Sequence, residues 1–195
     1  IWAERVNDVP DTRDAETVRV IAQQYAWNVH YPGPDGRFGA TRIDLVDEQD
    51  NPIGLDRSSE FAEDDFTTIN QLHIPVNRKI RVDLSSKDVI HNFKLPELRV
   101  SQDAIPGMVI PVHFTATSTS EEFLKTAVGT KREGKGLEIA CAQLCGLGHY
   151  RMKGYVTIHE EDDYQAWLDE QASYLEEEDG DDWGDDGDDW GDDDW

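Results

Sequence analysis

The sequence has little of three features that would define other classes of protein. With two cysteines in 195 residues, it cannot build a disulfide framework. No segment approaches the roughly 18–20 consecutive apolar residues that span a bilayer, and no secretory signal is present. Lys and Arg number 18 against 42 Asp and Glu, a net charge of −24. Such an excess of negative charge argues against nucleic acid as a partner and favours a basic protein partner.

The acidic residues are concentrated at the C-terminus. Thirteen of them fall in the last twenty residues, where Lys and Arg are absent and Trp recurs at 183, 190 and 195. This composition predicts a low-complexity acidic tail over 178–195 that is too charged to bury a core and is therefore disordered. Its role is open between solvation, recruitment of a basic protein partner and adaptation to high salt.

The N-terminal segment is also polar. The chain begins at Ile1 rather than Met, which indicates a processed or truncated product. We therefore expect residues 1–15 to form an arm that follows a membrane anchor missing from this chain.

The segment between these ends has the pattern of an all-β protein. Short apolar runs alternate with turn residues, which predicts an antiparallel sandwich or barrel over residues 16–160. One long strand is expected over 17–31 and a long surface loop over 46–68. Further strands are expected over 71–76, 79–84, 89–95, 108–117, 136–142 and 151–159. A C-terminal helix is expected over 161–177, because Tyr164, Trp167, Leu168 and Leu175 are spaced to share one face.

One segment near the end of the sandwich is rich in metal-binding side chains. Cys141, Cys145, His149 and Met152 fall within twelve residues. Thiolates, imidazole and thioether suit copper, whereas calcium and magnesium prefer oxygen, and a zinc site rarely recruits Met. A single blue copper normally uses one Cys, so two thiolates allow a bridged pair of copper ions. A disulfide between Cys141 and Cys145 is the competing interpretation.

A second copper ion would need a second imidazole from elsewhere in the fold. The clearest candidate is His91, within Ser86-Lys87-Asp88-Val89-Ile90-His91-Asn92-Phe93. By default, His30, His73, His113 and His159 are interpreted as structural or surface residues. Trp27 is interpreted as a core residue.

Together these motifs resemble subunit II of cytochrome c oxidase. The resemblance covers roughly residues 17–160 and includes Cys-x-x-x-Cys-x-x-x-His-x-x-Met, Ser-x-Asp-Val-x-His-x-Phe, Gln102-Asp103-Ala104-Ile105-Pro106-Gly107, Pro75-Val76-Asn77 and Gln24-Tyr25-Ala26-Trp27. It implies a cupredoxin-like Greek-key β-sandwich that holds a mixed-valence dinuclear copper centre, CuA.

The resemblance also implies a role for each matching residue. Cys141 and Cys145 correspond to the bridging thiolates, and His91 and His149 to the terminal imidazoles. The weak ligands correspond to Met152 on one copper ion and to the backbone carbonyl of Gln143 on the other.

Two positions depart from the family pattern. The family usually has Glu at position 143, whose carboxylate helps to bind magnesium at the contact with subunit I. The neutral amide of Gln143 is a poorer ligand for that cation, so the magnesium site is doubtful here. Many members have Trp where this chain has Tyr25, at the surface where electrons enter, which suggests a different docking partner or a cytochrome domain held in the same complex.

The resemblance implies an electron-transfer subunit at the outer, periplasmic face of an energy-transducing membrane. It would accept electrons from cytochrome c or a cytochrome domain and pass them to haem in subunit I, which holds the oxygen-reducing site. The alternatives are a stand-alone soluble CuA carrier, a copper-free structural subunit II of a quinol oxidase and the CuA domain of a nitrous oxide reductase. The last is disfavoured because 195 residues cannot hold its large propeller.

Overall fold

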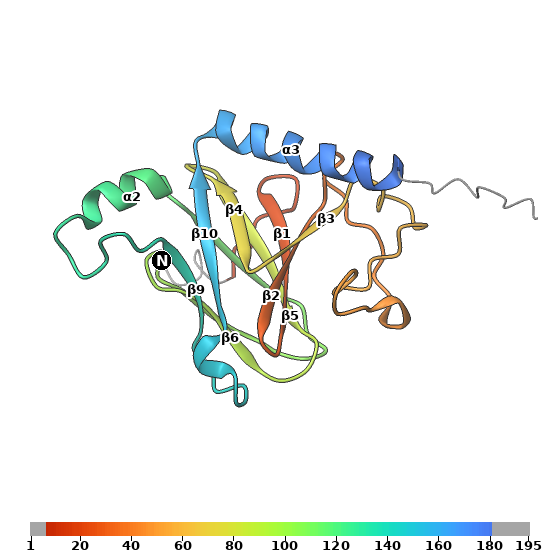
Figure 1. Ribbon diagram of the computed structural model, residues 1–195, viewed down its shortest axis with the longest axis horizontal. Coiled ribbons are helices and arrows are strands. Elements are labelled where there is room, and N and C mark those ends of the chain that lie inside the picture. The colour runs from red at the N-terminus through yellow and green to blue at the C-terminus, as the bar shows by residue number, and fades with distance from the viewer. Residues whose placement is uncertain (1–6, 181–195) are drawn as a thin grey trace, which may run out of the picture.

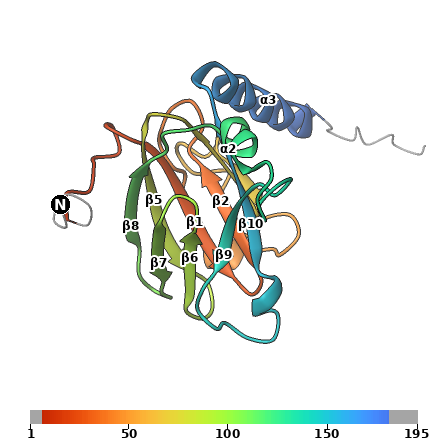
Figure 2. The same cartoon turned by 90° about the vertical axis from the view of Figure 1, so that its left-hand side faces the viewer.

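Two five-stranded sheets face each other in the computed structural model, which describes residues 7–180 (Figure 1, Figure 2). One sheet has the order β3 (Phe66–Ile69), β2 (Ala26–Tyr31), β1 (Glu16–Gln23), β5 (Lys79–Ser86) and β8 (Ile110–Thr115). The other has the order β4 (Gln71–Pro75), β10 (Lys153–His159), β9 (Leu137–Cys141), β6 (His91–Leu95) and β7 (Val100–Ala104). The predicted β-sandwich is confirmed.

The strand pairing is mixed rather than antiparallel throughout. β1 pairs with β5 in parallel, as β4 does with β10, whereas the other named pairs are antiparallel. The expectation of a wholly antiparallel sandwich is therefore wrong for these two pairs. Both join segments that lie far apart in the sequence, so local turn patterns carry no information on their direction.

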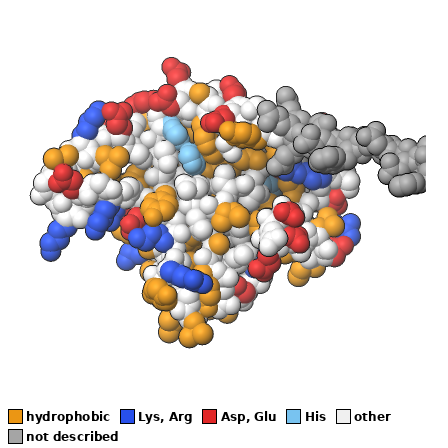
Figure 3. All heavy atoms as spheres, in the orientation of Figure 1, with side chains coloured by type: hydrophobic (Ala, Val, Ile, Leu, Met, Phe, Trp, Pro, Cys, Tyr) orange, Lys and Arg blue, Asp and Glu red, His pale blue; other side chains and the backbone are white. Residues whose placement is uncertain are grey.

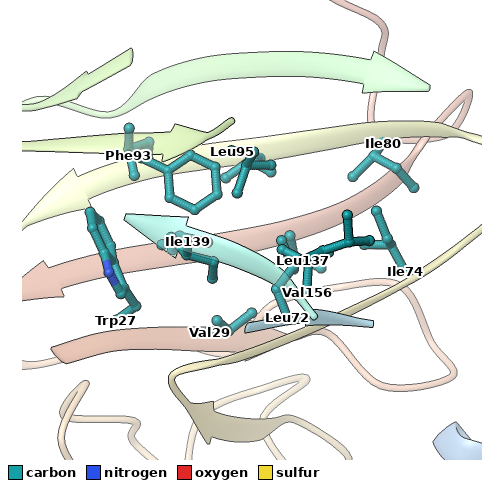
Figure 4. Close-up of a cluster of buried hydrophobic side chains, with 14 of the residues drawn as sticks. Trp27, Val29, Leu72, Ile74, Ile80, Phe93, Leu95, Leu137, Ile139 and Val156 are labelled. Carbon is teal, nitrogen blue, oxygen red and sulfur yellow. The ribbon is translucent and has the colours of Figure 1, made fainter. Parts of the chain in front are cut away.

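The core fills the space between the sheets. Strand β5 alternates between buried and less buried positions along its length, with Ile80, Val82 and Leu84 fully buried. Trp27 is also fully buried, as predicted, and its ring meets that of Phe93 edge to face at 5.5 Å (Figure 4). Burial of each such side chain contributes roughly 1.5–3 kcal/mol, so this core stabilises the packing of one sheet on the other.

The single long strand expected over 17–31 is instead a hairpin. β1 ends at Gln23 and β2 begins at Ala26, so Gln24 and Tyr25 form the turn between them. Tyr25 therefore lies at the tip of the hairpin and does not share a strand face with Trp27. The turn was missed because it contains no Gly, Pro, Asn or Asp to interrupt the apolar run.

Three elements were not predicted. The edge strands β3 and β7 are short, and the first three of the four residues of β3 lie inside the loop expected over 46–68. Helix α2 (Ser120–Ala127) has Thr119 as its N-cap residue, and the Thr119 side chain accepts a hydrogen bond from the backbone of Glu122. The side chain of Glu122 accepts one from the backbone of Thr119 in return, so a complete capping box holds this short helix.

Helix α3 (Glu161–Gly180) lies across the end of the sandwich that is opposite the β9–β10 loop (Figure 1). Its predicted apolar face is confirmed, since Tyr164 is buried and Trp167, Leu168 and Leu175 pack against the core. The tail predicted to be disordered lies outside the described residues from 181 onward, as does the start of the N-terminal arm, residues 1–6. Over residues 7–180, the helices lack the length and hydrophobicity needed to cross a membrane.

Candidate metal centre

The candidate ligands meet where β9, β6 and the β9–β10 loop come together. Cys141 is the last residue of β9, and Met152 immediately precedes β10. The loop between them carries Cys145 and a short 3-10 helix that begins at His149. β6 begins at His91 and pairs with β9, with Phe93 opposite Cys141. The sheet therefore brings His91 to the loop across fifty residues of sequence.

The predicted ligand atoms lie close together. Cys141 Sγ is 3.8 Å from Cys145 Sγ and 3.8 Å from His91 Nδ1. Cys145 Sγ is 3.5 Å from His149 Nδ1. Each imidazole thus lies beside a different thiol of the pair.

The two weak ligands expected from the family pattern each lie beside one of the two cysteine sulfurs. Met152 Sδ is 3.8 Å from Cys145 Sγ, and the backbone oxygen of Gln143 is 3.2 Å from Cys141 Sγ. Both cysteines are free thiols. The structure therefore brings together all six residues predicted from the sequence, and in the described part of the chain His91, Cys141 and Cys145 form a group with ligand atoms within 4.8 Å of one another.

Asp88 fixes the orientation of the His91 ring. Its Oδ1 is 2.8 Å from His91 Nε2, which leaves Nδ1 facing the thiols. The same carboxylate accepts hydrogen bonds from the backbone of Gln24 at 2.6 Å and of Val89 at 2.6 Å. Although partial burial opposes it, these bonds and that of His91 lower the pKa of Asp88. Sequence reasoning assigned no role to Asp88, although a carboxylate three residues before a candidate ligand is a usable signal.

The β1–β2 turn is hydrogen-bonded directly to the β9–β10 loop, which carries most of the candidate ligands. Gln24 Nε2 donates to the carbonyl oxygen of Cys145 at 2.6 Å. Gly146 and Gly148 lie against the Tyr25 side chain, so closely that a Cβ at either position would overlap its ring or hydroxyl. Tyr25, predicted to lie where electrons enter, is therefore in contact with the loop that carries Cys145.

The pKa of the Cys145 thiol indicates that this cluster needs a cation. Burial and the neighbouring Cys141 thiol raise the pKa of Cys145 to about 11. A sulfur that holds its proton so strongly becomes a thiolate at neutral pH only beside a cation. The two cysteine sulfurs with two imidazoles and a thioether form a soft donor set that fits copper.

The remaining histidines lie elsewhere. His30 is buried and its Nε2 is 2.6 Å from Asp65 Oδ2. His73 and His159 form a pair, with 2.9 Å between His73 Nδ1 and His159 Nε2, at the α3 end of the sheet. His113 lies on β8.

A mixed β-sandwich with this donor set at one end defines a cupredoxin-like domain with a metal-binding loop. The family model described as "Cytochrome C oxidase subunit II, periplasmic domain" matches residues 16–158. The chain belongs to this family.

Curated relatives agree with this assignment. The chain is 35% identical over 175 residues to "Alternative cytochrome c oxidase subunit 2" of Bradyrhizobium diazoefficiens, which covers 89% of this chain and 56% of the relative. It is 29% identical over 162 residues to cytochrome c oxidase subunit 2 of Cereibacter sphaeroides, covering 79% and 48%. The chain thus spans about half the length of these relatives.

Solved structures show the same fold. The periplasmic domain of subunit II of cytochrome oxidase (CoxB) of Bradyrhizobium japonicum matches with a TM-score of 0.54 and 26% identity, covering 86% of this chain and 99% of that one. A mixed disulfide intermediate between a thioredoxin-like protein and subunit II of cytochrome c oxidase matches with a TM-score of 0.52 and 26% identity, covering 86% and 96%. The predicted cupredoxin-like fold and family are confirmed.

Proposed function

We propose that this chain is the domain of a terminal oxidase that receives electrons, and that it holds a dinuclear copper centre of the CuA type. The observation that carries the proposal is the arrangement of two free thiols 3.8 Å apart, with one imidazole nitrogen beside each. A blue copper site would use one thiolate, and the second would have no role there.

The donor set fits this group, because the two sulfurs, the two imidazole nitrogens and the two weak ligands lie within 3.2–3.8 Å of one another in contacting pairs. Cys141 and Cys145 would bridge the two ions, and His91 and His149 would each bind one through Nδ1. Met152 and the backbone oxygen of Gln143 would supply the weak ligands. When bound, such a pair shares one electron over two metals, so little reorganisation accompanies its reduction.

The chain supplies rigidity and exclusion of water. His91 is fully buried and is held by Asp88, and Cys145 and Met152 are almost fully buried. Trp27 lies against His91 edge to face at 6.2 Å, so an aromatic core supports that ligand. Ligands held in this way before the metal arrives would keep their geometry in both oxidation states.

The partners and location follow from the family. We infer that the domain lies at the outer face of an energy-transducing membrane, receives electrons from cytochrome c or a cytochrome domain, and passes them to haem in subunit I. Gln143 presents an exposed amide where the family pattern has a carboxylate, so we do not assign a magnesium ion to it. A thioredoxin-like reductant that keeps both thiols free before copper arrives is a further partner suggested by the solved mixed disulfide.

The copper-free alternative is disfavoured by the site itself. A structural subunit of a quinol oxidase has no need for ligand side chains, yet here six candidate ligands converge. A stand-alone copper carrier would share this geometry, and would differ in lacking a haem-bearing partner.

Copper stoichiometry tests the proposal. After reduction and copper loading, elemental analysis should give two copper ions per chain, and Cys145→Ser should lose the pair. His113→Gln is the matched control, because it removes an imidazole on β8 outside the site, and it should keep both ions. One copper ion per chain, or a preference for zinc, would contradict the proposal.

A further inference from the structure

The part of the β9–β10 loop that carries Cys145 and His149 has few attachments to the rest of the molecule. Its large apolar side chains face solvent rather than the core, with Leu147 96% exposed and Tyr150 86%. Hydrophobic side chains gather at the lower end of the molecule in Figure 3, where Figure 1 places this loop. Packing of these exposed side chains therefore contributes little to holding the loop in place.

The hydrogen bonds of this loop lie mostly within it. The backbone N–H groups of His149 and Arg151 donate to carbonyl groups three residues earlier, both at 3.1 Å. Apart from contacts among the candidate ligands, one hydrogen bond in the described structure joins residues 143–151 to another part of the chain, and Gln24 makes it. Gln24 Nε2 donates to the carbonyl oxygen of Cys145 at 2.6 Å.

The backbone of the same glutamine is bonded to the other half of the site. The N–H of Gln24 donates to Asp88 Oδ2 at 2.6 Å, and Asp88 Oδ1 is 2.8 Å from Nε2 of His91. The pairing of β6 with β9 places His91 beside Cys141. Gln24 therefore bridges two groups of candidate ligands, namely those that the sheet holds and those that the loop carries.

We propose that Gln24 is a positioning residue of the copper centre, whose backbone N–H and side-chain amide set the distance between the ligands on the sheet and those on the loop. The inference rests on the proposed function, because it assigns to one residue the spacing of two copper ions. Two metal ions share an electron equally only if their surroundings match, so a loop that shifts relative to His91 would make the two ions unequal. Ligands that are fixed by such outer contacts keep this match.

The neighbouring contacts cannot take the place of this bond. Tyr25 packs against Gly146 and Gly148, but apolar packing is non-directional, whereas a hydrogen bond weakens steeply with distance and angle. Gln24 is exposed overall, yet its bond to Cys145 is partly buried, so water competes with it only in part. Loss of such a bond should change the opening of the loop about two- to tenfold.

Hydrogen exchange of the reduced, copper-free chain tests the role of Gln24 without any metal. Gln24→Met keeps the length of the side chain and the backbone N–H, but it removes the donor to Cys145. The backbone amides of His149 and Arg151 should exchange about two- to tenfold faster in this variant, because the loop opens more easily. Far-UV circular dichroism should be unchanged, since the substitution lies in an exposed turn.

Gln23→Met is the matched control. Gln23 lies next to Gln24 in the same hairpin, but its side chain bonds to Asn28 and Lys87, outside the β9–β10 loop. This variant also loses hydrogen bonds at the hairpin, so its loop amides should keep the parental exchange rate if the bond of Gln24 positions the loop. Equal rates in the parent and Gln24→Met, or the same acceleration in Gln23→Met, would overturn the proposal.

Electron paramagnetic resonance of the copper-loaded variants gives a readout that a purely structural role would not move. Elemental analysis should still find two copper ions per chain in Gln24→Met, while the hyperfine structure changes from equal to unequal sharing of the electron. Gln24→Glu places an acceptor against the carbonyl oxygen of Cys145 and should make the sharing more unequal. A parental spectrum in both variants, or loss of copper from Gln24→Met, would overturn the proposal. A parent spectrum from one copper nucleus would instead contradict the proposed function, and the exchange rates would still decide whether Gln24 positions the loop.

Discussion

The histidine pair at the α3 end should make the fold sensitive to acid. His73 Nδ1 lies 2.9 Å from His159 Nε2, and the His73 ring stacks on Trp167 of α3 at 4.2 Å. Burial and the neighbouring His159 lower the pKa of His73 from 6.5 to about 4, and burial also lowers the pKa of His159. Asp163 faces His159 and opposes that shift. The folded chain therefore resists protonation that the unfolded chain accepts.

The direction and the size of the change in unfolding free energy with pH follow from this difference in pKa between the folded and the unfolded chain. Stability from His73 is fully present above pH 6.5 and is lost as the pH falls towards 4. A shift of this size corresponds to about 3 kcal/mol without solvent, and screening of these partly exposed rings reduces it to about 1–2 kcal/mol between pH 7.5 and 4.5. His73→Phe keeps a ring on Trp167 but cannot be protonated, so its loss of stability over this range should be smaller than the parent's by that amount.

Urea unfolding of the reduced, copper-free chain, followed by far-UV circular dichroism, measures the free energy of unfolding of the parent and of His73→Phe at pH 7.5 and at pH 4.5. Other acid-sensitive groups, including the buried His30, remain in parent and variant and cancel in the comparison. Trp167→Phe is the control: it weakens the packing of α3 but keeps both histidines, so it should be less stable at both pH values with the parental pH dependence. If His73→Phe loses as much stability between pH 7.5 and 4.5 as the parent does, the histidine pair is not the cause of the acid sensitivity.

Two further substitutions test the support of the copper loop. Gly148→Ala should destabilise the chain by about 1–3 kcal/mol in urea unfolding, because the new Cβ would overlap the Tyr25 ring, whereas Gly136→Ala has open space and should cost far less. Asp88→Asn should keep the copper but weaken its affinity about 10- to 100-fold in chelator competition, because the amide holds the His91 ring less firmly; unchanged affinity would show that the core alone orients that ring.

The candidate site was more predictable than the fold around it because most of its ligands are local. Cys141, Cys145, His149 and Met152 share one loop, so their residue types and spacing are visible in the sequence. His91 lies fifty residues away, and only the second motif around it indicated that the sheet would bring it to the loop.

The missed elements have physical causes as well. The Gln24–Tyr25 turn has no residue that favours a turn, and the parallel pairs β1–β5 and β4–β10 depend on long-range packing that no local pattern encodes. Helix α2 is different, because Thr119 and Glu122 form a capping box that the sequence displays.

The central claim is that two copper ions share one electron between the thiolates of Cys141 and Cys145. Electron paramagnetic resonance of the copper-loaded chain tests it most directly. We expect hyperfine structure from one electron spread equally over two copper nuclei, and we expect this structure to be lost in Cys145→Ser. A spectrum from a single copper nucleus in the parent chain would contradict it.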